Sequence, residues 1–175
     1  FVSFSKNALD FKPDSRILGM FYFRVFNYKD KYYALAKNKN IDGVLYQSDR
    51  FDGDFQPVFN LIPNMRHASV YIDSDFLYIF YTVVGDSPES IMVLKIKLDR
   101  DIENWEIIEN QILLKPELEF EGHKLQMEPS LFGSALWPKN ELRDPFVFKN
   151  NGELYMFYSF AGEVGIALSK IKKMR

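Results

Sequence analysis

Short runs of hydrophobic residues recur along this chain, and turn residues separate them. The clearest example lies near the C-terminus, where residues 146–148, 154–160 and 164–171 are apolar and rich in aromatic side chains. Asn150-Asn151-Gly152 separates the first two runs, and Asn and Gly readily adopt the positive φ angles of hairpin turns. Ala161-Gly162-Glu163 separates the second and third runs. This part of the chain is therefore predicted to form three antiparallel strands.

The same pattern of strands and turns occurs twice more, nearer the N-terminus. Strands are predicted at residues 19–26, 32–36, 43–48 and 55–61, and then at 66–72, 76–84, 90–98 and 105–114. The second strands of the three units read YYALAKN, YIFYTVVGD and YMFYSFAGE. Tyr33 and Tyr78 are 45 residues apart, which matches about one four-stranded propeller blade. Tyr78 and Tyr155 are 77 residues apart, which equals one blade plus a long connection.

The repeat and the lack of helical periodicity predict an all-β fold, a partial β-propeller. Its four-stranded blades are expected at about residues 17–62, 66–115 and 142–175, with a long acidic connection at 116–141 and a stray strand at 1–5. The chain, 1–175, is thus interpreted as one propeller domain or a fragment of one. Three blades cannot close a ring, and ring closure is what protects the edges of a propeller. An ordinary β-sandwich without a repeat is the alternative fold.

The start of the chain bears on how such a ring would be completed. The chain begins at Phe1 rather than at Met, and residues 1–5 alternate like the tail of a strand. We therefore expect the sequence to be a piece of a longer protein or a processed product. Either the missing blades precede Phe1, or a partner chain, such as a second copy, completes the ring.

The composition of the chain argues against nucleic-acid binding, a membrane-spanning helix and thiolate chemistry. Hydrophobic residues make up 47% of the chain and aromatic residues 17%, which favours strands. The net charge of −2 offers no basic surface for nucleic acid. No apolar run approaches the roughly 20 residues of a membrane-spanning helix, so no membrane partner is expected. The chain has no cysteine, which excludes disulfides and thiolate chemistry and leaves the compartment unknown.

Propeller topology gathers the candidate site residues at one face of the ring. The first strand of each blade begins there, and the loop between the second and third strands returns there. The residues so gathered are Arg66, His67, Asp86, Glu89, Arg143, Asp144 and Glu163, together with the loop at 37–42. The long connection enters the last blade at the same face and brings Glu128. Carboxylates can accept hydrogen bonds from sugar hydroxyls, and two acids that flank one bond can act on a glycosidic linkage.

Each of these residues also has a purely structural interpretation. Arg143 and Asp144 can form a buried ion pair at a strand start, and His67 can be a hydrogen-bonded core histidine. Asp86 and Glu163 can cap their loops.

The remaining candidates are equally open to two interpretations. Glu128 can belong to ordinary loop chemistry. Arg24 and Arg66 can bind a carboxylate of a ligand or pair with neighbouring acids. Trp105 and Trp137 can be core residues or platforms for sugar stacking, and Trp137 is the one expected to be exposed.

Three motifs carry a resemblance to a known family. They are Arg66-His67-Ala68-Ser69-Val70, Arg143-Asp144-Pro145 and the segment AGEVGIA at residues 161–167. With them, the chain resembles the C-terminal portion of the five-bladed propellers of family 43 glycoside hydrolases and their relatives in families 32, 62 and 68. Residues 2–7 resemble the end of a preceding blade. The resemblance implies a five-bladed ring and a carbohydrate ligand in a central funnel.

The resemblance also implies roles for single residues. It places His67 near the centre of the funnel. It also implies that Asp144 contacts sugar hydroxyls and stabilises the transition state. The aspartate base and modulator of such enzymes would come from blades that precede Phe1. Their general acid, a glutamate that opens the third blade, has no counterpart at Phe21-Tyr22-Phe23, where Arg24 is the nearest charge. Glu128 is the candidate to replace it.

We therefore expect a glycosidase-like carbohydrate-active propeller and leave its catalytic activity open. The catalytic candidates are Asp144 and Glu128, and the substrate-binding candidates are Arg24, Arg66, His67, Asp86, Arg143 and Glu163. No cofactor or metal ligand is predicted, although a structural calcium ion stays compatible with the resemblance. The alternatives are a non-catalytic propeller that binds glycan or protein, and a partial propeller completed by a partner chain.

Overall fold

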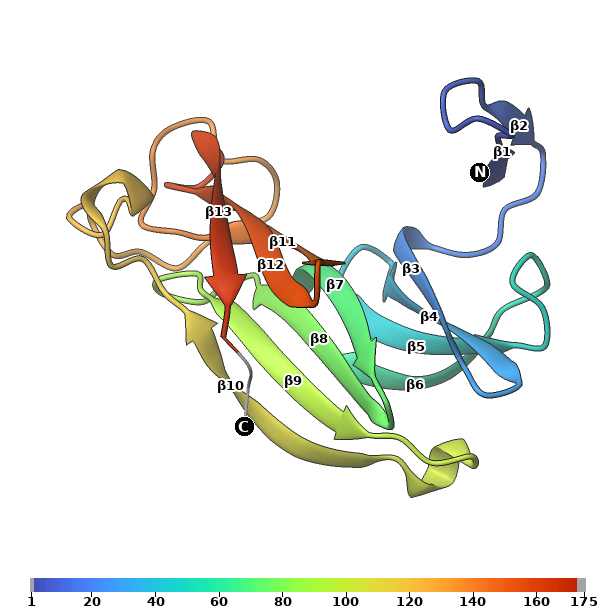
Figure 1. Ribbon diagram of the computed structural model, residues 1–175. Helices are drawn as coiled ribbons and strands as arrows, with labels where there is room; N and C mark the ends of the chain where they lie inside the picture. Colours follow the sequence, from blue (N-terminus) through green and yellow to red (C-terminus); the bar gives the residue numbers. More distant parts are fainter. Residues whose placement is uncertain (1, 173–175) are drawn as a thin grey trace. The chain divides into compact units, whose positions relative to one another are not determined.

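A computed structural model describes residues 2–172, and β-strands are the main regular structure in it (Figure 1). The strands form four antiparallel sheets, and the chain divides into two compact units, Phe1–Leu61 and Ile62–Arg175. The fold class predicted from the sequence, an all-β partial propeller, is confirmed. Two short 3₁₀ helices, η1 (Ile102–Asn104) and η2 (Glu119–Glu121), interrupt the connections. Within residues 2–172, no helix has the length and apolar character needed to cross a membrane.

The first unit contains a four-stranded sheet of β3 (Phe21–Tyr28), β4 (Lys31–Asn38), β5 (Asp42–Ser48) and β6 (Gln56–Ile62), in that order. Its core is built on β4 and β5, whose side chains alternate between the two faces of the sheet. The cluster consists of Ala34, Ala36, Val44, Tyr46 and Phe55. Burial of these side chains is the main stabilising contribution to the sheet.

The N-terminal strand differs from the prediction. Instead of a stray strand, β1 (Val2–Phe4) pairs with β2 (Lys12–Asp14) in a two-stranded sheet. The sequence pattern predicted no strand at Lys12–Asp14. This strand contains Pro13 and is mostly exposed, so neither hydrophobic alternation nor strand propensity marks it in the sequence.

The second unit holds two sheets, which we call the second and third sheets. The second sheet consists of β7 (Met65–Asp73), β8 (Phe76–Val83), β9 (Ile91–Lys97) and β10 (Glu106–Leu114) in sequential order. The third consists of β11 (Arg143–Asn150), β12 (Glu153–Phe160) and β13 (Gly165–Ile171). Within the described residues the third sheet thus has three strands, one fewer than a complete four-stranded blade.

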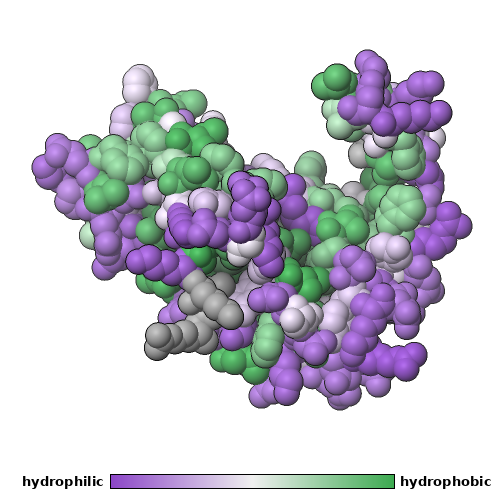
Figure 2. Space-filling model, viewed as in Figure 1, coloured by the Kyte–Doolittle hydropathy of each residue, from purple (hydrophilic) through white to green (hydrophobic). Residues whose placement is uncertain are grey.

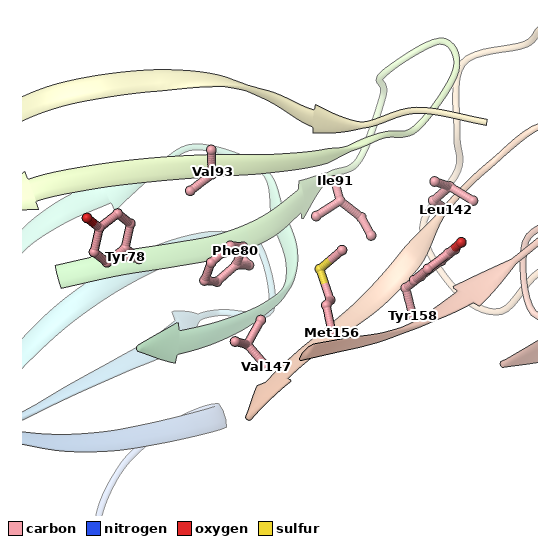
Figure 3. Packing of buried hydrophobic residues seen from close by; sticks show 8 residues of the cluster. All are labelled: Tyr78, Phe80, Ile91, Val93, Leu142, Val147, Met156 and Tyr158. Atoms are coloured by element: carbon pink, nitrogen blue, oxygen red, sulfur yellow. The ribbon is translucent and has the colours of Figure 1, made fainter. Parts of the chain in front are cut away.

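The second and third sheets pack face to face through one hydrophobic core (Figure 3). The second sheet contributes Tyr78, Phe80, Ile91 and Val93, and the other side of the core contains Leu142, Val147, Met156 and Tyr158. A buried hydrogen bond also joins the sheets, because the Val147 N–H donates to Ser69 Oγ at 3.0 Å. The starts of β7 and β11 are therefore fixed relative to each other.

Each of the strands β3, β7 and β11 carries a bulge near its start. In each bulge, two residues of the strand lie opposite one residue of its partner, between Phe21 and Arg24, between Met65 and Ala68, and between Arg143 and Phe146. A bulge re-aims side chains at the end of a strand. By register, Tyr22, Arg66 and Asp144 occupy the same place in the three sheets.

The long connection between β10 and β11 is anchored by a buried carboxylate. Glu121 accepts a hydrogen bond from the Tyr158 hydroxyl at 2.7 Å and bonds from the backbone N–H groups of Glu117 and Leu118, both at 2.9 Å. Burial and the adjacent Glu121 raise the pKa of Tyr158 well above its ordinary value. The connection is thereby fastened to β12.

Candidate functional site

The candidate site lies where β7 and β11 begin, and its centre is the carboxylate of Asp144. Asp144 Oδ1 contacts His67 Nδ1, and Asp144 Oδ2 accepts a hydrogen bond from Ser159 Oγ at 2.8 Å. His67 comes from β7, Asp144 from β11 and Ser159 from β12, so three strands orient one carboxylate. The Asp144 side chain nevertheless keeps 38% of its surface exposed. It can therefore accept hydrogen bonds from a ligand.

Asp144 lies in the bulge of β11. Its φ angle is 52°, in the left-handed region that Asp and Asn tolerate better than most residues. Burial alone would raise the pKa of Asp144, but the contacts with His67 and Ser159 and the nearby charge of Arg143 bring it below its ordinary value of 3.8. Asp144 is thus an ionised hydrogen-bond acceptor at neutral pH rather than a proton donor.

Two arginines at the same end share one fully buried carboxylate. Arg66 Nε lies 2.8 Å from Glu89 Oε1 and 3.0 Å from Glu89 Oε2. Arg143 Nε lies 3.6 Å from Glu89 Oε2. The exposed fraction of Glu89 is 0%, so its charge depends on these two guanidinium groups for compensation. Glu89 therefore links the loop before β9 to the first residue of β11.

Arg143 has two further carboxylate partners. Its Nη2 lies 2.5 Å from Glu141 Oε2, and its Nη1 lies 2.8 Å from Glu163 Oε1. Both arginines are almost completely buried. The ion pairs of Arg143 are formed with Glu89, Glu141 and Glu163, whereas the structural interpretation from the sequence paired it with Asp144. Arg66 pairs with a neighbouring acid, Glu89, which is one of the two interpretations given for it.

The same arginines hold the last part of the long connection. Arg66 donates to the carbonyl oxygens of Gly133 at 3.0 Å and Leu131 at 2.5 Å, and Arg143 donates to Gly133 at 3.2 Å. The Ala135 N–H donates to Glu163 at 3.3 Å. We call residues 131–137 the apolar loop, because its large side chains are hydrophobic. Its backbone is bound at three residues by charged side chains.

Most side chains of the apolar loop point into solvent. The exposed fractions are 75% for Leu131, 58% for Phe132, 80% for Leu136 and 75% for Trp137. Figure 2 shows hydrophobic residues gathered over the region where Figure 1 draws β13 and the chain that leads into β11. The exposure expected for Trp137 from its place in a loop agrees with this position.

Asp86 and Glu128 also belong to this part of the unit. The Ser130 N–H donates to the Asp86 carbonyl at 3.0 Å, which brings the loop after β8 next to the connection. Burial and the negative charge of Glu89 raise the pKa of Asp86 above its ordinary value of 3.8. Glu128 is partly exposed and forms an ion pair with Lys139 at 3.0 Å. A role of Glu128 as a proton donor would require this pair to break.

Two further features belong to other parts of the chain. Arg24 is an exposed residue of β3, in the first unit. A groove of about 800 Å³ lies at the opposite end of the second and third sheets, where Tyr71, Phe76, Glu153 and Lys170 are among the lining residues. None of the predicted site residues lines this groove. Among residues 2–172, no group of three or more histidine and carboxylate side chains is placed to hold a metal ion.

Sequence reasoning missed two residues of the cluster, Ser159 and Glu141. Ser159 faces Arg143 across β11 and β12, a pairing that depends on the register of the two strands. Glu141 forms an isolated parallel bridge with Glu89. Neither residue stands in a motif, so the sequence gives only the weak signal that polar residues interrupt apolar strands.

Comparison with the sequences of known proteins gives a relative but no family. No protein-family model matches the chain. An uncharacterised protein of Acanthamoeba polyphaga mimivirus is 34% identical over 190 residues, which cover 98% of this chain and 52% of that protein. The chain therefore spans about half the length of the curated relative it matches.

Several solved structures are similar in three dimensions. Bacteroides ovatus Xyloglucan PUL GH43B has 12% identity and a TM-score of 0.53, over 89% of this chain and 29% of that chain. An alpha-L-arabinanase mutant of Cellvibrio cellulosa has 13% identity and a TM-score of 0.51, over 86% of this chain and 52% of that chain. An endo-1,4-beta-xylanase of Bacteroides thetaiotaomicron has 18% identity and a TM-score of 0.50, over 90% of this chain and 55% of that chain. At these identities the likeness shows the fold alone, which is that of part of a family 43-like glycoside hydrolase propeller.

Proposed function

We propose that the chain is part of a carbohydrate-active propeller of the glycoside hydrolase type, with its ligand at the end of the sheets where Asp144 lies. The observation that carries this proposal is the Asp144 carboxylate. It is ionised, partly exposed and oriented by His67 and Ser159. Such an acceptor suits the hydroxyl groups of a sugar, because hydrogen bonds to charged acceptors are about twice as strong as neutral ones.

Cleavage of a glycosidic bond needs a second carboxyl group that can donate a proton. Glu128 is the candidate from the sequence, but it is engaged by Lys139. The place that corresponds to Asp144 in the first sheet is held by Tyr22, which has no carboxyl group. The pKa of Asp86 is raised by burial and by the charge of Glu89, which is the direction that favours a proton donor. If this chain contributes an acid to catalysis, we therefore favour Asp86 over Glu128.

The proposed ring has five blades, of which the chain supplies three. The third sheet supports this arrangement, because one of its faces packs on the second sheet while the other carries exposed Phe146, Phe157 and Leu168. An exposed apolar sheet face of this kind is the surface on which a further blade would pack. The source of the remaining blades, the same polypeptide or a partner chain, is a separate question.

Saccharide binding to purified protein tests the proposal. Xylohexaose and arabinohexaose are titrated by calorimetry into the wild type and into Asp144→Asn, and release of reducing ends is followed in parallel. Asparagine tolerates the positive φ angle and fills the same volume, so the variant should fold. Loss of a charged hydrogen bond, worth about 1.5–3 kcal/mol, should weaken binding by about 10- to 150-fold.

The matched control is Asp73→Asn, an exposed aspartate at the opposite end of β7. Its affinity should equal that of the wild type. Binding without release of reducing ends would favour a non-catalytic glycan-binding propeller. Absence of binding to both saccharides, or equal affinity of Asp144→Asn and wild type, would overturn the proposal.

A further inference from the structure

A groove lies between hairpin turns of the second and third sheets. The turn after β7 contributes Asp73 and Ser74, and the turn between β11 and β12 contributes Gly152 and Glu153. Asp144 stands at the start of β11, so the groove is at the other end of the sheets. Its volume of about 800 Å³ is within the range of small-ligand sites. Because the two sheets share one core, the groove exists before a ligand binds.

One side of the groove is aromatic. Tyr71 of β7 and Phe76 of β8 line it, and both side chains are half-buried. Tyr78 lines it as well, and its ring centroid lies 6.3 Å from that of Tyr71. Both Tyr71 and Phe76 pack against the core that the two sheets share. These rings therefore offer a ligand flat apolar area that is already held in place.

The groove carries more positive than negative charge. Three lysines line it, Lys149, Lys170 and Lys172, against two acids, Asp73 and Glu153. Lys170 and Glu153 form an ion pair with each other, which lowers the pKa of Glu153 and raises that of Lys170. Within residues 2–172, no ion pair engages Lys149 or Lys172. Two ammonium groups are thus open to a ligand, opposed by the single carboxylate of Asp73.

A fourth lysine stands next to the aromatic side. Lys95 Nζ lies 4.8 Å from the ring centroid of Phe76 and 5.6 Å from that of Tyr78. Its charge adds to the positive potential of the groove. A ligand that matches this groove therefore combines anionic groups with a flat apolar face. A uronic acid has both, since each unit carries one carboxylate and a ring with a C–H face.

From this combination we propose that the groove is a second binding site, separate from Asp144, and that it takes an acidic saccharide built of uronic acids. The sugar ring packs on the aromatic side, and its carboxylates bind Lys149 and Lys172. The choice of a saccharide rests on the proposed function. The site itself and its preference for negative charge do not. An acidic peptide offers similar carboxylates and is the alternative ligand that the experiment has to exclude.

Calorimetry with hexagalacturonate tests the two lysines. Lys149→Gln and Lys172→Gln should each weaken binding by about 2- to 5-fold, the range of solvent-exposed ion pairs. The double variant should weaken it by about 4- to 25-fold, because separate contacts add. Lys12→Gln, which removes an exposed lysine of the first unit, is the charge-matched control and should bind as the wild type does.

Two further variants separate ligand contact from folding. Asp73→Asn should strengthen hexagalacturonate binding by about 2-fold, because it removes a like charge from the groove, and damage to the fold cannot tighten binding. Phe76→Leu keeps an apolar side chain on the core but loses the aromatic face, and should weaken binding by about 2- to 10-fold. In NMR spectra, hexagalacturonate should shift the amide signals of Ser74 and Gly152, which locates the site.

The outcomes separate this inference from the proposed function. Absence of hexagalacturonate binding, or equal affinity of the wild type and the double lysine variant, would overturn the inference alone where neutral saccharides still bind through Asp144. Tighter binding of hexaglutamate than of hexagalacturonate would overturn the saccharide class. Asp144→Asn should bind hexagalacturonate as the wild type does. Failure of the proposed function would instead appear as absent xylohexaose and arabinohexaose binding, with lysine-dependent hexagalacturonate binding preserved.

Discussion

The second and third sheets contain nearly the same strand in different surroundings. β8 includes the sequence YIFYTV and β12 the sequence YMFYSF, in the same position of each sheet. Phe80 in β8 is fully buried, whereas Phe157, its counterpart in β12, leaves 38% of its surface exposed. The side chains next to them, Ile79 and Met156, are both buried. Two strands of equal hydrophobicity thus differ in how many of their faces are covered.

The exposed face of the third sheet is organised, not irregular. Phe148 is nearly parallel to Phe157, with ring centroids 5.4 Å apart, and to Tyr155, with centroids 5.6 Å apart. Phe146 stacks on Phe148 at 6.4 Å. Cross-strand aromatic pairs of this kind stabilise a sheet by themselves. The comparison teaches that burial of a strand depends on its neighbours as well as on its own residues.

The largest predicted effect comes from the carboxylate that joins the two sheets. Glu89→Ala should destabilise the protein by about 3–5 kcal/mol, because it leaves the buried charges of Arg66 and Arg143 without a shared partner. Chemical denaturation measures the free energy of unfolding. Glu119→Ala, which removes an exposed pair with Lys124, is the control and should leave the midpoint unchanged. A loss of less than about 1 kcal/mol in the free energy of unfolding of Glu89→Ala would contradict the role of Glu89 as the shared partner of the two arginines.

A pair of equivalent substitutions tests the comparison itself. Phe80→Ala should cost about 3–5 kcal/mol, since it opens a cavity between the two sheets, and Phe157→Ala should cost less than half as much. Both free energies are measured by the same denaturation experiment. Equal losses would mean that the outer face of the third sheet is covered in solution as completely as the inner face.

The smallest predicted effects on stability come from two aspartates, Asp144 and Asp86, whose pKa values are shifted in opposite directions. The pKa of Asp144 lies below 3.8 in the folded protein, so its charge adds stability that is lost only as the pH falls below 3.8. The pKa of Asp86 is raised above 3.8, so its charge lowers stability, and this penalty is relieved as the pH falls through that raised pKa. At pH 7, Asp144→Asn should lower the thermal midpoint and Asp86→Asn should raise it.

Each of these shifts should stay within about 2–4 °C, the change that 1 kcal/mol produces in a domain of this size. Thermal unfolding at pH 7, 5 and 3 provides the measurement. The difference between Asp86→Asn and wild type should already shrink above pH 3.8, and that of Asp144→Asn should do so only below it. Thermal midpoints that shift in the same direction for Asp144→Asn and Asp86→Asn would contradict the opposite pKa shifts of the two aspartates.

Much of the fold could be predicted from local sequence. The strands β3 to β13 follow from apolar runs and from turns such as Asn150-Asn151-Gly152, because hairpin geometry is a local property of the backbone. The spacing of Tyr33 and Tyr78 by about one blade, and the recurrence of the same strand at Tyr155, carried the propeller interpretation. The short pair of β1 and β2 could not be predicted, since a polar strand with Pro13 has no periodic signal.

The candidate site could be predicted only in part. Topology alone brings the starts of β7 and β11 together, so Arg66, His67, Arg143 and Asp144 could be grouped from the sequence. The sequence could not predict which of these side chains is open to a ligand. Asp144 is partly exposed, whereas Arg66, at the equivalent bulge position, is buried because Glu89 pairs with both arginines.

The sequence by itself therefore determined the strand pattern, the repeat and the end of the sheets at which polar residues gather, since these depend on side-chain alternation and turn residues. Only the tertiary structure decided that Ser159 and His67 orient Asp144, that the arginines hold the apolar loop and that one face of the third sheet is open. Such features depend on register and packing between segments far apart in the chain, and no local pattern of residues encodes them.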